Sequence, residues 1–137
     1  MTAHPMRPGR LVLGAAFVSA GVAHFAAPQV FLAMMPPWLP AHGPLVALSG
    51  VAEIAGGLGV LVDRTRRGAG WGLIVLLVAV FPANLQMLLN AIAASASGGS
   101  VTALVARLPL QPLLIWWVWR VTVRESPPRE PRAGATT

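Results

Sequence analysis

Long apolar stretches constrain this chain more than any other feature of its sequence. Four of them reach membrane-spanning length, at about residues 11–27, 45–62, 69–94 and 101–123. An α-helix rises about 1.5 Å per residue, so the shorter stretches just cover a hydrocarbon layer of about 30 Å. Because hydrocarbon cannot satisfy backbone N–H and C=O groups, such stretches must be helical. The sequence therefore predicts an all-α fold, a four-helix transmembrane bundle.

The composition excludes several classes of function. Of the 137 residues, 55% are hydrophobic and only 10% are charged, which is not the balance of a soluble domain. The chain has no cysteine, which excludes disulfides, Cys-ligated zinc, iron–sulfur clusters and covalently attached haem. A haem held by two histidines would need a second histidine inside an apolar stretch, and only His24 lies in one. The formal net charge of +6 does not indicate nucleic acid, because the arginines form no single face interleaved with aromatic residues.

The arginines flank the apolar stretches and so predict how the chain is oriented. Nine of them would lie on one side of the membrane: Arg7, Arg10, Arg64, Arg66, Arg67, Arg120, Arg124, Arg129 and Arg132. By the positive-inside rule, both termini are then cytoplasmic in a multi-pass protein of the bacterial cytoplasmic (inner) membrane. A cleaved signal peptide over residues 1–26 is the alternative, since this segment has basic, apolar and small residues in the required order. Cleavage would leave three spans and spoil the agreement among the arginines.

A Pro-rich segment, residues 28–43, joins the first two apolar stretches. It is too apolar for a solvated loop and too rich in proline for a fifth span, so we expect it at the membrane interface. Its large apolar side chains would dip into the headgroup boundary: Phe31, Leu32, Met34, Met35 and Trp38. The thioethers of Met34 and Met35, together with His42, superficially suggest a copper site. This donor set is weak evidence, and no metal is expected.

The chain shows no internal repeat and is expected to form a single membrane domain over residues 1–137. Residues 125–137 contain three prolines and two arginines and predict a disordered cytoplasmic tail.

Glu53 is the one acidic residue within the four apolar stretches. A charged side chain at mid-membrane costs about 3 kcal/mol on the insertion scale, so such a residue usually faces a partner or a cavity. Ser49, Gly56 and Gly57 share its helical stripe, and small residues mark the places where membrane helices approach closely. We therefore expect Glu53 to point into the bundle. A purely structural role, with a hydrogen bond to His24 or Arg107, is the competing interpretation.

The predicted orientation brings polar residues of all four helices to one layer in the outer half of the bundle. His24 lies about 20 Å along the first helix, and Glu53 lies about 12 Å below the outer end of the second. Asn84 falls in the outer half of the third helix, and Arg107 and Gln111 lie one turn apart on the fourth. These five residues are the ligand-binding candidates, and no residue is assigned as catalytic.

Three more of these residues also have a structural interpretation. His24 would be a satisfied histidine near a helix end, Arg107 an interfacial anchor and Gln111 an amide that packs helices together. Gln86 and Asn90 form a second face of the third helix, so the amides of that helix cannot all point to one centre.

Several motifs resemble the DoxX-like family of small bacterial integral membrane proteins, over about Val12 to Trp119. They are Gly21-Val-Ala-His24-Phe25, followed by Pro28, Phe31 and Met35-Pro-Pro-Trp-Leu-Pro40, then Ser49-Gly-Val-Ala-Glu53-Ile-Ala-Gly-Gly-Leu-Gly59, Phe81-Pro-Ala-Asn84 and Arg107-Leu-Pro-Leu-Gln111-Pro112. The resemblance implies a four-helix membrane bundle and a link to respiratory or redox processes. It also implies that the five candidate residues occupy motif positions.

Two functions of different classes follow. The first is a non-enzymatic membrane subunit, or a bundle that binds a small apolar, quinone-like molecule at the polar layer. The second is a membrane enzyme acting on a lipid or isoprenoid, with Glu53 as acid or base and His24 as its partner. A proton conduit is disfavoured because the inner half of the bundle has no ionisable stepping stones. The expected partners are membrane lipids and a membrane or respiratory protein, not nucleic acid, and a homo-oligomer remains open.

Overall fold

The computed structural model describes residues 7–94 and 98–124, without the side chains of residues 98–100, 103 and 107. The regular secondary structure of these residues is entirely helical, without a strand, which confirms the all-α fold class for this part of the chain. The elements are α1 (Pro8–Ala26), α2 (Pro28–Leu32), α3 (His42–Gly59), α4 (Arg66–Ala93), α5 (Gly98–Val118) and a π-helix, η1 (Trp119–Arg124). The predicted tail at residues 125–137 lies outside the described residues.

The four longest helices coincide with the four apolar stretches, with ends displaced by a few residues. Within the described residues, α1 and α4 are long and apolar enough to cross a membrane, by length and composition alone. Helix α3 begins three residues earlier and ends three residues earlier than the predicted span 45–62. Compared with the predicted span, α3 includes the polar His42 and lacks the apolar residues 60–62, so its mean hydropathy is lower. The four-helix transmembrane arrangement therefore stays a prediction.

Prolines begin helices in this chain and also lie inside them. Pro8 and Pro28 stand at the first helical positions of α1 and α2, where an N–H would have no helical partner. Pro82 lies inside α4, and Pro109 and Pro112 lie inside α5. Both helices continue through these prolines.

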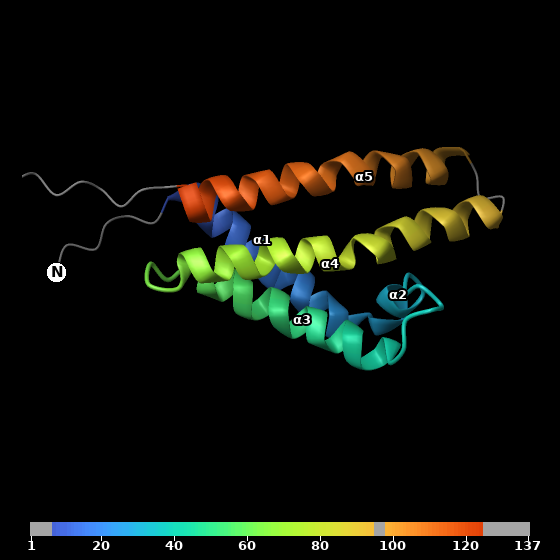
Figure 1. The fold of residues 1–137 in the computed structure, drawn as a ribbon, viewed down its shortest axis with the longest axis horizontal. Helices are drawn as coiled ribbons and strands as arrows, with labels where there is room; N and C mark the ends of the chain where they lie inside the picture. The colour runs from blue at the N-terminus through green and yellow to red at the C-terminus, as the bar shows by residue number, and fades with distance from the viewer. Residues whose placement is uncertain (1–6, 95–97, 125–137) are drawn as a thin grey trace, which may run out of the picture.

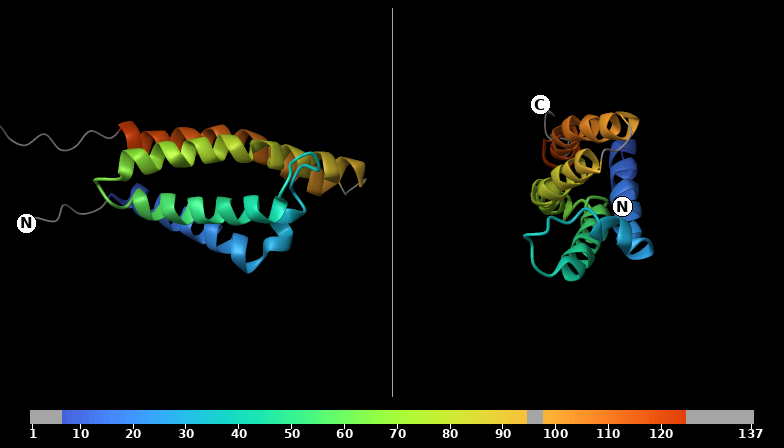
Figure 2. Two further views of the ribbon diagram at one scale, coloured as in Figure 1. Left: turned by 60° about the horizontal axis from the view of Figure 1, so that its bottom comes forward. Right: turned by 90° about the vertical axis from the view of Figure 1, so that its right-hand side faces the viewer.

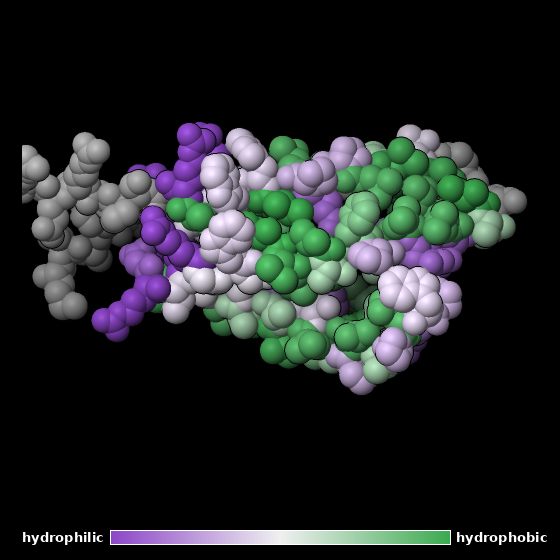
Figure 3. Space-filling view, viewed as in Figure 1, coloured by the Kyte–Doolittle hydropathy of each residue, from purple (hydrophilic) through white to green (hydrophobic). Residues whose placement is uncertain are grey.

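Consecutive long helices are neighbours in space, in the order α1, α3, α4, α5 (Figures 1 and 2). The start of α1, the turn between α3 and α4, and η1 lie at the same end of the molecule (Figure 1). We call this the arginine end, because it carries Arg7, Arg10, Arg64, Arg66, Arg67, Arg120 and Arg124. Figure 3 shows hydrophilic residues gathered there, whereas hydrophobic residues cover much of the remaining surface on this face.

The apolar core lies in the half of the bundle nearest the arginine end. Every long helix or its adjoining turn contributes to it, through Leu13, Phe17, Val60, Leu73, Leu77, Val118 and Val121. In this half η1 contacts both α1 and α4 and so brings the ends of the bundle together. The apolar core thus lies between the arginine end and the candidate polar residues.

Glycines allow α1 and α3 to pack backbone against backbone. A Cβ on Gly21 would lie 2.6 Å from the carbonyl oxygen of Gly50, and a Cβ on Gly57 would lie 2.8 Å from that of Gly14. The glycines recur every seven residues on each helix, so one stripe of small residues faces the other along the whole contact. This close pairing brings His24 on α1 beside Glu53 on α3.

Candidate functional site

His24 and Glu53 form a buried pair between α1 and α3. The distance from His24 Nδ1 to Glu53 Oε2 is 3.4 Å, and the side chains are 9% and 12% exposed. His24 Nδ1 also lies 3.0 Å from the carbonyl oxygen of Ala20, which can only accept, so this nitrogen carries the proton. Glu53 Oε2 is buried and accepts no hydrogen bond from the described residues. The pair therefore leaves a carboxylate oxygen with unused acceptor capacity.

Phe31 covers His24 from the segment that follows α1. Its ring stacks on the imidazole with a centroid distance of 3.7 Å and an interplanar angle of 23°. Phe31 was expected at the lipid headgroups, and the structure adds a contact that the sequence did not predict: the ring is half-buried against His24. The stacking contact buries one face of the apolar Phe31 ring against the imidazole.

Asn84 and Gln111 form a second pair, between α4 and α5. Asn84 Nδ2 donates to Gln111 Oε1 at 2.7 Å, and Gln111 Nε2 donates to the carbonyl oxygen of Leu77. Both amides line a pocket of about 220 Å³ whose other walls are Leu77, Leu110 and Leu114. The pocket thus combines apolar walls with two polar groups that orient each other.

His24 and Glu53 lie on α1 and α3, whereas Asn84 and Gln111 lie on α4 and α5. The structure thus brings His24 together with Glu53, and Asn84 together with Gln111, as two pairs on different helix pairs.

Arg107, the fifth candidate, lies within α5 one turn before Gln111, but its side chain is outside the described residues. The other amides of α4 have different partners, as the sequence predicted. Gln86 Nε2 donates to Asn90 Oδ1 at 2.8 Å, and Asn90 Nδ2 donates to the carbonyl oxygen of Ala33 at 3.4 Å. This second face ties α4 to the segment after α2.

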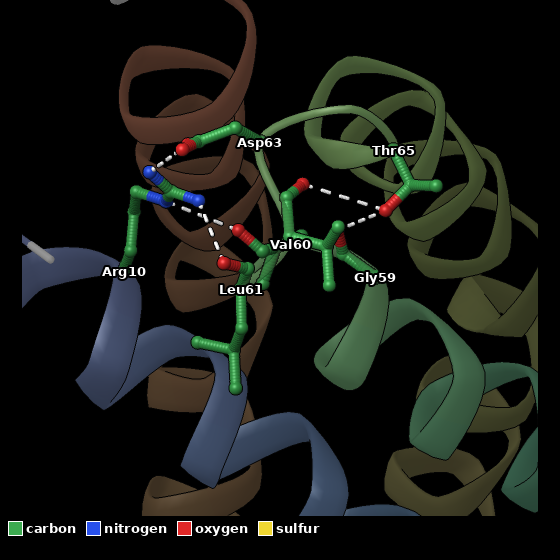
Figure 4. Close-up of polar contacts among 7 residues, drawn as sticks. Arg10, Gly59, Val60, Leu61, Asp63 and Thr65 are labelled. Atoms are coloured by element: carbon green, nitrogen blue, oxygen red, sulfur yellow. Dashed lines mark hydrogen bonds and ion pairs between the residues drawn. The ribbon is translucent and has the colours of Figure 1, made fainter. Parts of the chain in front are cut away.

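The sequence did not reveal a cluster of polar contacts around the buried Arg10 at the arginine end, which we call the Arg10 cluster (Figure 4). Arg10, only 6% exposed, donates from Nε to the carbonyl oxygen of Val60 at 3.1 Å and from one terminal nitrogen to that of Leu61 at 2.9 Å. Its other terminal nitrogen pairs with Asp63 Oδ1 at 2.6 Å. From the sequence, Arg10 indicated only the orientation of the chain. Asp63, the single acid in the basic turn after α3, was the signal available.

No three His, Cys, Asp or Glu side chains gather into a metal-binding group within residues 7–94 and 98–124. The imidazole of His42, which superficially suggested copper, has its Nε2 3.0 Å from the carbonyl oxygen of Pro36. This contact fixes the turn before α3, where Ala41 adopts a left-handed conformation with φ 54°.

Comparison with known proteins gives one match. The model of a family described as a domain of unknown function (DUF8561) matches residues 13–122, which include both polar pairs. No curated protein and no solved structure matches the chain.

Proposed function

The chain belongs to the DUF8561 family, and because that family is described as a domain of unknown function, we propose a function from the site itself. The protein is a multi-pass membrane protein whose four-helix bundle binds a small apolar molecule with a polar head, such as a quinone. It acts as a non-enzymatic binding protein or membrane subunit. Both termini lie in the cytoplasm and the Pro-rich segment lies outside.

The exposed surface supports the membrane location. Helices α3 and α5 both expose large apolar side chains, such as Leu48 at 64% on α3 and Leu110 at 57% on α5. Only 17% of the most apolar stretch of α4 is buried inside the protein, whereas a core helix of a soluble protein is mostly buried. Such surface on every long helix needs an apolar solvent.

The role of α1 in the core supports its retention in the mature protein. Leu13 is fully buried, Phe17 is 5% exposed, and Arg10 binds the turn after α3. Removal of residues 1–26 as a signal peptide would take away these contacts and the partner of Glu53. The bundle is therefore best explained with four spans.

One observation carries the ligand proposal: the buried Glu53 Oε2 accepts no hydrogen bond from the described residues, although it lies in an apolar bundle. A buried carboxylate oxygen is costly unless a donor reaches it. A hydroxyl group on an apolar molecule supplies that donor. The pocket at Asn84 and Gln111 supports the same proposal, because apolar walls with a few polar groups are the lining expected for a molecule of this kind.

Native mass spectrometry of the purified protein, with analysis of the lipids that copurify, tests the proposal. We expect one apolar molecule with a polar head per chain. Glu53→Gln keeps the shape of the side chain but removes its charge, and should weaken ligand binding by roughly 10- to 100-fold, the loss expected for one charge-assisted hydrogen bond. Asp63→Asn makes the same chemical change at an 86% exposed side chain and should leave binding unchanged.

The contrast with Glu53→Ala separates binding from structure. Alanine removes the charge contact with His24 and the buried atoms of the Glu53 side chain, so it should also lower the free energy of unfolding, by about 1–3 kcal/mol. If Glu53→Gln retains the ligand at full occupancy while Glu53→Ala only loses stability, Glu53 is structural. A wild-type bundle that is empty under every extraction condition would argue against ligand binding altogether.

The His24–Glu53 contact favours a second candidate function. A carboxylate 3.4 Å from an imidazole is a suitable acid–base pair for an enzyme acting on a lipid or isoprenoid. Turnover distinguishes the two: an enzyme would release a modified product on incubation with the copurified molecule, and a binding protein would return it unchanged.

A relationship to the DoxX-like proteins is part of the same proposal. We infer from the motifs around His24 and Glu53 a distant relationship to the DoxX-like proteins, and with it a respiratory or redox partner in the membrane. Crosslinking in intact membranes, followed by identification of the captured protein, tests the partner.

A further inference from the structure

The outward face of α5 and η1 carries two arginines stacked on tryptophans. The guanidinium carbon of Arg120 lies 5.5 Å from the ring centroid of Trp116, and that of Arg124 lies 5.6 Å from the ring centroid of Trp119. Trp116 is 49% exposed, and both arginines are exposed. Each guanidinium therefore offers its ring-facing side to an indole while its N–H edge stays available.

The π-helix sets this arrangement. Trp116 and Arg120 are four residues apart, the spacing that stacks side chains on an α-helix, whereas Trp119 and Arg124 are five residues apart. Five residues correspond to the i→i+5 repeat of a π-helix, which begins at Trp119. The change of helix type thus places the second pair directly after the first on one face.

The opposite face of this segment is held against the bundle. Val118 and Thr122 are fully buried, and Val121 is 7% exposed. Gly70 of α4 makes room for Thr122, since a Cβ there would lie 2.0 Å from the threonine Oγ1. The Arg–Trp pairs are consequently displayed from a segment that cannot rotate freely.

The described carboxylates do not neutralise these arginines. Within residues 7–94 and 98–124 the acidic residues are Glu53 and Asp63, and these pair with His24 and Arg10. Arg120 and Arg124 are therefore positive charges at the arginine end that the described carboxylates leave uncompensated. Tryptophan beside arginine at the edge of an apolar surface is the chemistry of a membrane interface.

We propose that Trp116, Trp119, Arg120 and Arg124 form a binding site for the phosphate headgroup of an anionic phospholipid. The guanidinium groups bind phosphate oxygens through paired N–H donors, and the indole rings hold them in plane at the headgroup boundary. The acyl chains lie along the exposed apolar face of α5, which includes Leu113, 55% exposed. The site is distinct from the polar layer and rests only on the membrane location proposed above.

Lipid titration with native mass spectrometry tests this site. The probes are phosphatidylglycerol and phosphatidylcholine added to the full-length protein in neutral detergent. We expect retained phosphatidylglycerol with little phosphatidylcholine. The Arg120→Gln/Arg124→Gln variant should bind phosphatidylglycerol roughly 25-fold more weakly, since each basic residue near an anionic surface contributes about 1 kcal/mol, or roughly fivefold.

Two matched variants separate a built site from general positive charge. Arg64→Gln/Arg67→Gln removes the same charge from exposed arginines at the same end and should weaken binding much less. Arg120→Lys/Arg124→Lys keeps the charge but loses the planar fork, and should still weaken binding several-fold. Equal losses in the two glutamine variants, or full binding by the lysine variant, would overturn the proposal.

A competition experiment identifies the anion. Millimolar inorganic phosphate should not displace phosphatidylglycerol if the acyl chains contribute to binding. Displacement by phosphate would instead show a site for a soluble anion and overturn the lipid assignment. Recovery of the protein from membranes only with detergent provides the separate check on the membrane location, so a failure there is distinguishable from a failure of the headgroup site.

Discussion

The guanidinium of Arg10 joins two segments that are fifty residues apart in sequence. The last carbonyl groups of a helix have no partner in the helix and form the negative end of its dipole. Arg10 supplies donors to the carbonyl groups of Val60 and Leu61 directly after α3, and its charge suits that end. At the residue scale this contact fixes α1 against α3 at the arginine end.

We predict that Arg10→Met lowers the free energy of unfolding by about 2–3 kcal/mol, because it removes charge-assisted hydrogen bonds from a buried position. Asp63→Asn should cost less than about 1 kcal/mol, because its carboxylate is 86% exposed and solvent screens the pair. Denaturant or thermal unfolding in detergent measures both. Arg64→Met, at an exposed position, is the control and should change stability little. Equal losses for Arg10→Met and Asp63→Asn would mean that the carbonyl contacts contribute nothing.

At the element scale, the contact between α1 and α3 depends on the absence of side chains. Gly14 and Gly21 on one helix face Gly57 and Gly50 on the other, with backbone oxygens where a methyl group would lie. Backbone cannot move aside as a flexible side chain can, so an added Cβ must separate the helices. Separation would also lengthen the distance between His24 and Glu53.

We predict that Gly21→Ala destabilises the protein by about 1–3 kcal/mol, as overpacking of a tight contact does, and weakens ligand binding at Glu53. Gly72→Ala is the matched control, because nothing lies within 4 Å of a Cβ built there. Replacing an unhindered helical glycine should leave stability unchanged or raise it by up to about 1 kcal/mol. If both variants are equally stable, the close approach of α1 and α3 is not essential.

At the scale of the whole molecule, the even number of long helices places the two ends of the described chain at the arginine end (Figure 1). The same end carries all the arginines of the described residues except Arg107. In the proposed membrane location, this uneven distribution would place the arginine end in the cytoplasm by the positive-inside rule.

We predict that a reporter fused after Thr137 is cytoplasmic and that one inserted at Pro37, in the exposed turn between α2 and α3, is outside. A fluorescent protein that folds only inside the cell and a phosphatase active only outside it provide the two readouts. Both reporters in one compartment would contradict the four-span arrangement.

The sequence by itself determined the helices. Apolar stretches in a chain with few charges leave the backbone only its own hydrogen bonds, so the positions of α1, α3, α4 and α5 follow within a few residues. Glu53 could also be singled out, since a lone acid among apolar residues has few reasons to be there. The small residues on its stripe correctly indicated that it faces a neighbouring helix.

Only the tertiary structure decided which polar residues meet. His24 pairs with Glu53 and Asn84 with Gln111 because the glycine stripes set the spacing of α1 and α3, while α4 and α5 pack at a different contact. The ring of Phe31 on His24, the Arg10 cluster and the π-helical stacking of Arg124 on Trp119 were likewise not predictable. Each depends on the distance between segments remote in sequence or on a helix type that hydrophobic periodicity does not encode.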